Sequence, residues 1–101
     1  MRAIILVVLV LGTLSETSGA YAAKVGQTCG GFPGIQCDEG LWCDPQPGKC
    51  GAADAQGKCV KVPEICTRQR RPVCGCDGTT YSNNCVRQSK KVALKSIGPC
   101  K

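Results

Sequence analysis

The stretch CTRQRRPVCGCDGTTYSNNC, residues 66–85, decides the fold. An Asp-Gly pair at residues 77–78 separates two short segments, and the segment after it is β-branched and aromatic, which predicts a small β-hairpin. Ser82 or Asn83 can then cap a helix, which we expect to cover residues 82–94. Cys85 falls in the first turn of that helix, so a disulfide at this position would tie the helix to a loop.

The beginning of the chain predicts a secretory signal peptide over residues 1–22. Arg2 precedes an uncharged run from Ala3 to Leu14, followed by small and polar residues. This run is shorter than the roughly 20 apolar residues that a membrane-spanning helix needs. We expect cleavage after Ala22, and cleavage after Ala20 fits nearly as well. The protein would then be secreted, to the extracellular space or to the periplasm in a bacterium.

The cysteines indicate a small disulfide-rich protein. All ten follow residue 22, and exported thiols meet oxidising conditions, so we expect them to be paired. The chain has no histidine and no repeated C-x2-C arrangement, which argues against a metal site. The lack of histidine also removes the Ser-His and Cys-His pairs of most nucleophilic hydrolases. We therefore expect a binding protein without a cofactor, and not an enzyme.

Charge and cysteine distribution both divide the chain near residue 57. Residues 23–57 carry two lysines against four acidic residues, whereas residues 58–101 carry ten basic residues against two acidic ones. The first segment holds four cysteines and the second six, so each can close its own disulfides. We predict an N-terminal Cys-rich module over residues 23–57 and a second domain over residues 58–101. Neither a nucleic-acid-binding signature nor a membrane span after the signal peptide is recognisable.

The second segment combines a cysteine spacing with several short motifs. The spacing is Cys66-x7-Cys74-x10-Cys85, the motifs within it are Pro72-Val73-Cys74-Gly75, Asp77-Gly78, Thr80-Tyr81 and Asn83, and the segment ends in Ile97-Gly98-Pro99-Cys100. In this combination the segment resembles a Kazal domain. The resemblance implies an α+β fold, with a short hairpin or three-stranded sheet and one helix over 82–94, after an irregular Cys-rich hairpin module. It also implies a serine protease inhibitor whose reactive bond is Arg68-Gln69.

The same resemblance assigns roles to the residues of the loop. The reactive-site loop would consist of Thr67, Arg68, Gln69, Arg70 and Arg71, and its supports would be Asn83, Tyr81 and Pro72. Asn83 would brace both sides of the reactive bond through loop carbonyls. Independently of the family, Pro72 restricts Arg71 to extended backbone geometry. An arginine at the reactive position favours trypsin-like proteases with an acidic specificity pocket.

The disulfide pairing also follows from the resemblance, with one departure. The family usually has a cysteine three residues after the helical one, where this chain has Gln88. The family's pairing carries over as Cys66 with Cys85 and Cys74 with Cys100, and it leaves Cys59 for Cys76. Six cysteines permit 15 pairings, so spacing alone does not choose among them.

The N-terminal module gives a weaker pattern. Its segment Cys37–Cys43, followed by Cys50, is similar to the cysteine-rich hairpin that precedes Kazal domains in follistatin-like proteins. Four cysteines allow three pairings, of which we expect Cys29 with Cys43 and Cys37 with Cys50.

Three functions follow as hypotheses. The first is a secreted, monomeric inhibitor of a trypsin-like serine protease. The second is a follistatin-like module that binds a growth factor or matrix protein and inhibits no protease. The third is a cationic defence or polyanion-binding protein that uses Arg87, Lys90, Lys91 and Lys95 on the predicted helix.

Overall fold

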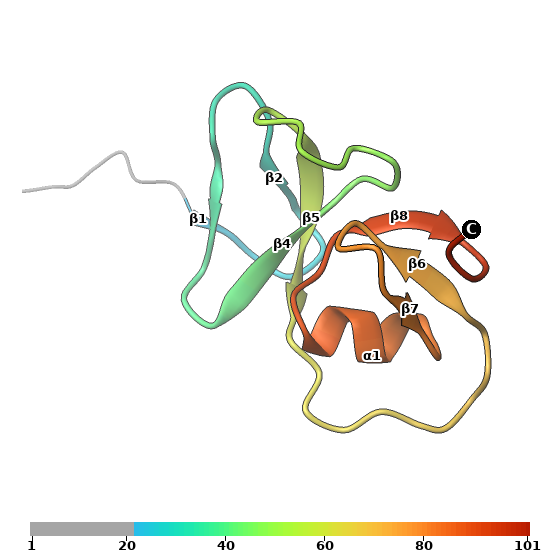
Figure 1. Ribbon diagram of the computed structural model, residues 1–101. Helices are drawn as coiled ribbons and strands as arrows, with labels where there is room; N and C mark the ends of the chain where they lie inside the picture. The colour runs from blue at the N-terminus through green and yellow to red at the C-terminus, as the bar shows by residue number, and fades with distance from the viewer. Residues whose placement is uncertain (1–21) are drawn as a thin grey trace, which may run out of the picture.

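The computed structural model describes residues 22–101, so the predicted signal peptide lies, except for Ala22, outside the described residues. The described part is built from two small antiparallel sheets, a two-stranded parallel pair and one short helix (Figure 1). In the described residues no helix is long and apolar enough to cross a membrane. The elements in chain order are β1 (Ala22–Ala23), β2 (Thr28–Gly30), β3 (Gln36–Cys37), β4 (Leu41–Pro45), β5 (Gln56–Lys61), β6 (Val73–Gly75), β7 (Thr80–Tyr81), α1 (Asn84–Ser89) and β8 (Leu94–Ile97).

The N-terminal half is organised around strand β5. Strands β2 and β4 pair with it on either side in antiparallel fashion, while β1 and β3 form a separate parallel pair. Strand β5 crosses the boundary predicted between residues 57 and 58. Its pairing with β2 reaches Lys58 and its pairing with β4 reaches Lys61, so residues 58–61 belong to the N-terminal sheet. Gly57 allows this packing, since a Cβ there would lie 2.3 Å from the Asp44 carbonyl oxygen.

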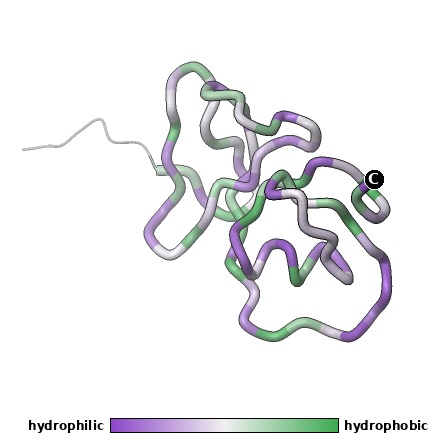
Figure 2. Tube along the Cα trace, in the orientation of Figure 1, coloured by the Kyte–Doolittle hydropathy of each residue, from purple (hydrophilic) through white to green (hydrophobic). Residues whose placement is uncertain are grey.

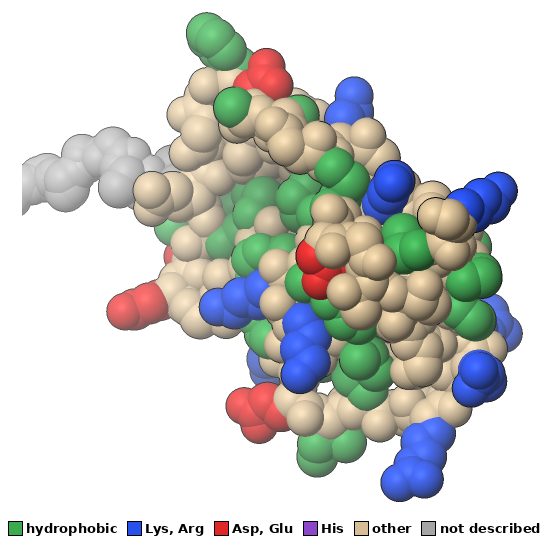
Figure 3. Space-filling model, in the orientation of Figure 1, with side chains coloured by type: hydrophobic (Ala, Val, Ile, Leu, Met, Phe, Trp, Pro, Cys, Tyr) green, Lys and Arg blue, Asp and Glu red, His purple; other side chains and the backbone are tan. Residues whose placement is uncertain are grey.

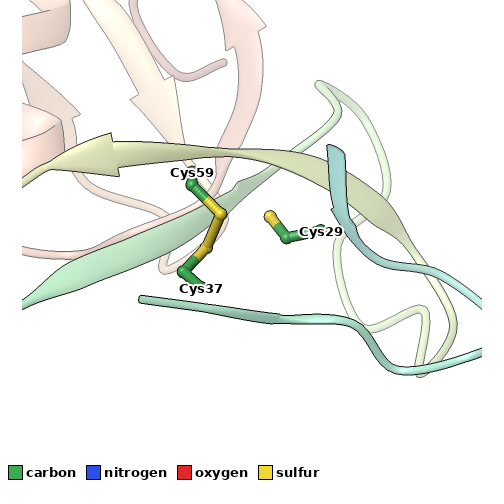
Figure 4. Close-up of side chains that lie close together, drawn as sticks. All are labelled: Cys29, Cys37 and Cys59. Atoms are coloured by element: carbon green, nitrogen blue, oxygen red, sulfur yellow. A yellow bond between two sulfur atoms is a disulfide. The ribbon is translucent and has the colours of Figure 1, made fainter. Parts of the chain in front are cut away.

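The core of this half consists largely of sulfur. Ala23, Cys29 and Cys59 are fully buried, and Ile35, Leu41 and two further cysteines pack against them. The sulfur atoms of Cys29, Cys37 and Cys59 lie within 4.8 Å of one another (Figure 4), but each belongs to a disulfide and none is a free thiolate that could bind a metal. Disulfides thus supply much of the stabilisation that so small an apolar core cannot provide.

All ten cysteines are paired, and three of the five expected disulfides are confirmed: Cys29–Cys43, Cys66–Cys85 and Cys74–Cys100. The expected pairs Cys59–Cys76 and Cys37–Cys50 are wrong, because the structure joins Cys37 to Cys59 and Cys50 to Cys76. The idea that each half closes its own disulfides therefore fails.

The two pairings are exchanged because Cys59 and Cys50 do not lie with the halves to which the predicted boundary at residues 57 and 58 assigned them. Cys59 belongs to β5 and so to the N-terminal sheet, where β3 brings Cys37 to it. The segment before Cys50 lies against the C-terminal half, because the Gly48 amide donates to the Leu94 carbonyl at 3.0 Å. Cys50 is thereby carried to Cys76.

The C-terminal half contains the predicted hairpin and a three-stranded sheet in the order β7-β6-β8. Gly78 occupies the hairpin turn with φ +81°, a conformation that glycine adopts without strain. This small disulfide-rich α+β architecture confirms the predicted fold class.

The helix is shorter than predicted. Asn83 caps it, as one of the two expected capping residues, but α1 covers only residues 84–89 and not 82–94. Lys91 leaves the helical conformation at φ +56°, and the buried Leu94, in β8, pairs with Gly75 of β6. The end of the predicted helix, at Leu94, therefore belongs to the sheet.

Candidate functional site

The segment between β5 and β6 forms a loop that leaves the body of the molecule on the side away from the N-terminal strands (Figure 1). Residues 65–72 form no helix, strand or turn, and Thr67 to Arg71 are all exposed. The disulfides Cys66–Cys85 and Cys74–Cys100 fix the two ends of the loop to the helix and to the chain's end. The part of the loop that leads to β6 is hydrophilic, while the stretch before it is hydrophobic (Figure 2) and includes the exposed Ile65.

The side chain of Asn83 connects this loop to the body by hydrogen bonds. Its Nδ2 donates to the Thr67 carbonyl at 3.1 Å and to the Gln69 carbonyl at 2.7 Å, which belong to the two peptide groups on either side of the Arg68-Gln69 peptide bond. Its Oδ1 accepts from the Val86 amide at 2.9 Å, which is the capping contact of the helix. One buried side chain, 6% exposed, therefore satisfies both the loop and the helix start.

Further backbone contacts hold the second half of the loop. The Arg71 amide donates to the Ser82 carbonyl at 2.8 Å, and the Pro72 carbonyl accepts from the Gly98 amide at 2.9 Å. Between these contacts and the body lies an open groove of about 780 Å³, lined in part by Thr67, Gln69 and Asn83. The loop is thus attached to the body by a few defined hydrogen bonds and not by side-chain packing.

Tyr81, which the resemblance placed among the loop supports, acts on the hairpin. Its hydroxyl donates to the Asp77 carboxylate, and this bond lowers the pKa of Asp77 and raises the pKa of Tyr81. Its ring lies so close to Gly75 that a Cβ at that glycine would be 2.8 Å from a ring carbon. Tyr81 therefore stabilises the turn of the β6–β7 hairpin beneath the loop and makes no hydrogen bond to Thr67–Arg71.

The positive charges that sequence reasoning grouped on the helix are not equivalent. Lys90, Lys91 and Lys95 are exposed, and Figure 3 shows Lys and Arg side chains spread along the margin of the C-terminal half. Arg87, in contrast, is only 1% exposed and forms a salt bridge with Asp44. The prediction that Arg87 contributes to a polyanion-binding surface is wrong, because its charge is buried and already paired.

Sequence reasoning missed Asp44 and the true role of Arg87. Nothing in the sequence alone indicated that Arg87 is buried, since an arginine beside a single valine, Val86, is typical of a solvated surface charge. The sequence did not indicate that the partner would come from the other half of the chain.

Comparison with known proteins identifies the second half. The sequence model of the Kazal-type serine protease inhibitor domain matches residues 50–100, so the match begins at Cys50, ahead of the domain start predicted at residue 58. The preceding follistatin-like module finds no counterpart in this match.

Several curated relatives share this region. Serine protease inhibitor Kazal-type 1 of Bos taurus is 37% identical over 51 residues, which cover 45% of this chain and 65% of the relative. Serine protease inhibitor Kazal-type 6 of Homo sapiens is 44% identical over 41 residues, covering 35% and 51%. A double-headed protease inhibitor of the submandibular gland of Vulpes vulpes is 45% identical over 49 residues, 43% of each chain.

The chain therefore spans less than two thirds of the length of each of these three relatives. The matched residues nevertheless include the sheet β7-β6-β8, the helix α1, the loop between β5 and β6, and Asn83. On this evidence the chain belongs to the Kazal-type serine protease inhibitor domain family.

Proposed function

We propose that this protein is a secreted inhibitor of trypsin-like serine proteases, with Arg68-Gln69 as its reactive bond and residues 67–71 as its reactive-site loop. The observation that carries the proposal is the pair of hydrogen bonds from Asn83 to the carbonyls of Thr67 and Gln69, on either side of Arg68. The relatives described above, which are named as protease inhibitors, support it.

The affinity of such a loop would come from its being formed before the protease arrives. A protease binds its substrate as an extended strand, so a flexible loop would lose conformational entropy on binding. Ordering each backbone residue costs about 1–2 kcal/mol, and seven residues lie between Cys66 and Cys74. Because two disulfides and Asn83 already order this loop, that cost falls on folding and not on association.

The same contacts explain why the loop would resist digestion. If a protease cleaves after Arg68, the new amino group of Gln69 stays attached through Cys74, and Asn83 still holds the Gln69 carbonyl. The tethered amine therefore remains at high effective concentration beside the acyl group. Religation of the Arg68-Gln69 bond then competes with hydrolysis, so a protease would process the bound protein only slowly.

The exposed Arg68 would determine the target. A guanidinium presents parallel N–H donors that match a carboxylate, so it would form a bidentate contact with an acidic pocket floor. A chymotrypsin-like pocket offers no such acid, and an arginine in it would lose hydration without gaining a partner.

The test is a titration of trypsin, chymotrypsin and subtilisin with the refolded, oxidised protein. We expect stoichiometric inhibition of trypsin, loss of most of it in Arg68→Ala, and near-normal inhibition by the matched control Lys90→Ala, which removes an exposed cation outside the loop. High salt separates this role from polyanion binding through exposed Lys90, Lys91 and Lys95, because screening weakens surface contacts much more than a buried ion pair. Rapid cleavage of the wild-type loop as an ordinary substrate would end the proposal.

A further inference from the structure

Arg87 in α1 is a buried cation with an unusually complete set of partners. Nη1 donates to Asp44 Oδ1 at 2.9 Å and Nη2 to Asp44 Oδ2 at 2.9 Å, which is a bidentate pair. Nη1 also donates to the Val92 carbonyl at 2.6 Å, and Nε to Asn84 Oδ1 at 2.8 Å. Since a buried guanidinium requires a counter-charge, Asp44 is the group that permits Arg87 to occupy this position.

Asp44 also accepts a hydrogen bond from Gln88, which stands where the family usually has a cysteine. Gln88 Nε2 donates to Asp44 Oδ2 at 2.8 Å, at the position three residues after Cys85. Cys50 pairs instead with Cys76, outside the helix, so the helix has one covalent attachment, Cys66–Cys85 in its first turn. The carboxylate of Asp44, on β4, therefore holds the second half of the helix, which no disulfide holds.

A short path leads from this carboxylate to the loop. The Arg87 amide donates to the Asn83 carbonyl at 3.2 Å, and Asn83 carries the two bonds to the loop carbonyls. Helix α1 lies between β4 and the loop (Figure 1). Six residues are too few to form a stable helix without tertiary contacts, so the place of Asn83 depends on what fixes this helix.

We infer that Asp44 is a positioning residue for the reactive-site loop. It acts from outside the core Kazal domain, by neutralising Arg87 and binding Gln88, and it fixes the helix whose N-cap supports Thr67 and Gln69. The N-terminal module is then a working part of the inhibitor, although it lies on the side of the molecule away from the loop (Figure 1). This inference rests on the proposed function for its inhibitory consequence, but its structural part can be measured without a protease.

The test compares full-length Asp44→Asn with the wild type and with the matched control Asp38→Asn. Asp38 belongs to the same module, but its side chain is 43% exposed and pairs at 3.5 Å with exposed Lys24. Amide hydrogen exchange is followed at Arg71 and Val86, which report on the loop and the helix start, and at Cys59, whose amide donates to Gln27 within the N-terminal half.

We expect Asp44→Asn to accelerate exchange at Arg71 and Val86 by about tenfold or more, because it leaves the buried guanidinium without a counter-charge. Exchange at Cys59 should stay near the wild-type value, the dissociation constant for trypsin should rise by about the same factor as the loop exchange, and Asp38→Asn should change none of these. Unchanged exchange at Arg71 and Val86, or a uniform increase that includes Cys59, would overturn the positioning role.

A milder variant covers the case in which Asp44→Asn does not fold. Gln88→Met removes one hydrogen bond from Asp44 but leaves the ion pair, so exchange at the same two amides should rise by about twofold to tenfold. No rise in a folded Gln88→Met protein would count against the inference. If the wild type fails to inhibit trypsin, the proposed function fails, whereas the exchange pattern still decides whether Asp44 positions the loop.

Discussion

Asn83 can be changed so that its two tasks are separated. Serine is a good N-cap and can still accept from the Val86 amide, but it is too short to reach the carbonyls of Thr67 and Gln69. Asn83→Ser therefore removes the two loop bonds and leaves the helix capped. Ser82→Ala is the matched control, since Ser82 is exposed and its side chain makes no hydrogen bond among the described residues.

The magnitude follows from the number of bonds removed. Each hydrogen bond contributes about 0.5–1.5 kcal/mol net, so losing two costs about 1–3 kcal/mol of loop preorganisation. At about 1.4 kcal/mol per factor of ten, the inhibition constant for trypsin should rise by about fivefold to 150-fold. Because the freed carbonyls belong to exposed residues that water can reach, the lower half of this range is expected.

The assay is a tight-binding titration of trypsin with each variant, together with a thermal unfolding curve. Asn83→Ser should unfold within a few degrees of the wild type and inhibit more weakly, while Ser82→Ala should match the wild type in both. The reasoning is refuted if Asn83→Ser inhibits as tightly as the wild type while Arg68→Ala does not inhibit.

Three further predictions concern the scaffold. The hydrogen bond with Tyr81 lowers the pKa of Asp77, so this bond contributes stability that is present above the ordinary carboxyl pKa of 3.8 and is lost as pH falls through the lower pKa of the folded state. Urea unfolding of Asp77→Asn should lack this loss at acidic pH, and a parallel decline in both proteins would contradict it. Gly57→Ala should destabilise the protein by about 1–3 kcal/mol or more, because the added Cβ would lie 2.3 Å from the Asp44 carbonyl oxygen. An unchanged denaturation midpoint would disprove this close approach. The sequence favours signal cleavage after Ala22, but the burial of Ala23 favours the alternative cut after Ala20, because a cut after Ala22 would place a charged amino group on this fully buried residue. An intact mass that shows the secreted protein beginning at Ala23 would contradict the cut after Ala20.

The C-terminal half could be predicted well because its determinants are local. The Asp77-Gly78 turn, the Asn83 cap and the Cys66 and Cys74 pairings follow from short-range sequence patterns or from the family they indicate. The helix end was misjudged because no glycine or proline interrupts residues 84–94, and only the pairing of Leu94 with Gly75 reveals that Leu94 belongs to β8.

The relation between the two halves could not be predicted, because it depends on contacts between residues far apart in the chain. Composition placed Cys59 with the basic segment, yet hydrogen bonding places it in the central strand of the N-terminal sheet. The Asp44–Arg87 pair spans 43 residues, and each partner alone is typical of a solvated surface charge. The change in charge near residue 57 therefore marks a change in composition and not a structural boundary. Strand β5 and the disulfides Cys37–Cys59 and Cys50–Cys76 cross it.

In the proposed function, a basic residue is held beside a peptide bond that a protease can reach but not efficiently cleave. Prolonged incubation of the oxidised protein with a catalytic amount of trypsin, followed by N-terminal sequencing and intact mass, tests this directly. We expect one new N-terminus, at Gln69, with intact and singly cleaved chains persisting together at equilibrium. Complete conversion, or a first cut at Arg70, Arg71 or a lysine elsewhere, would contradict it.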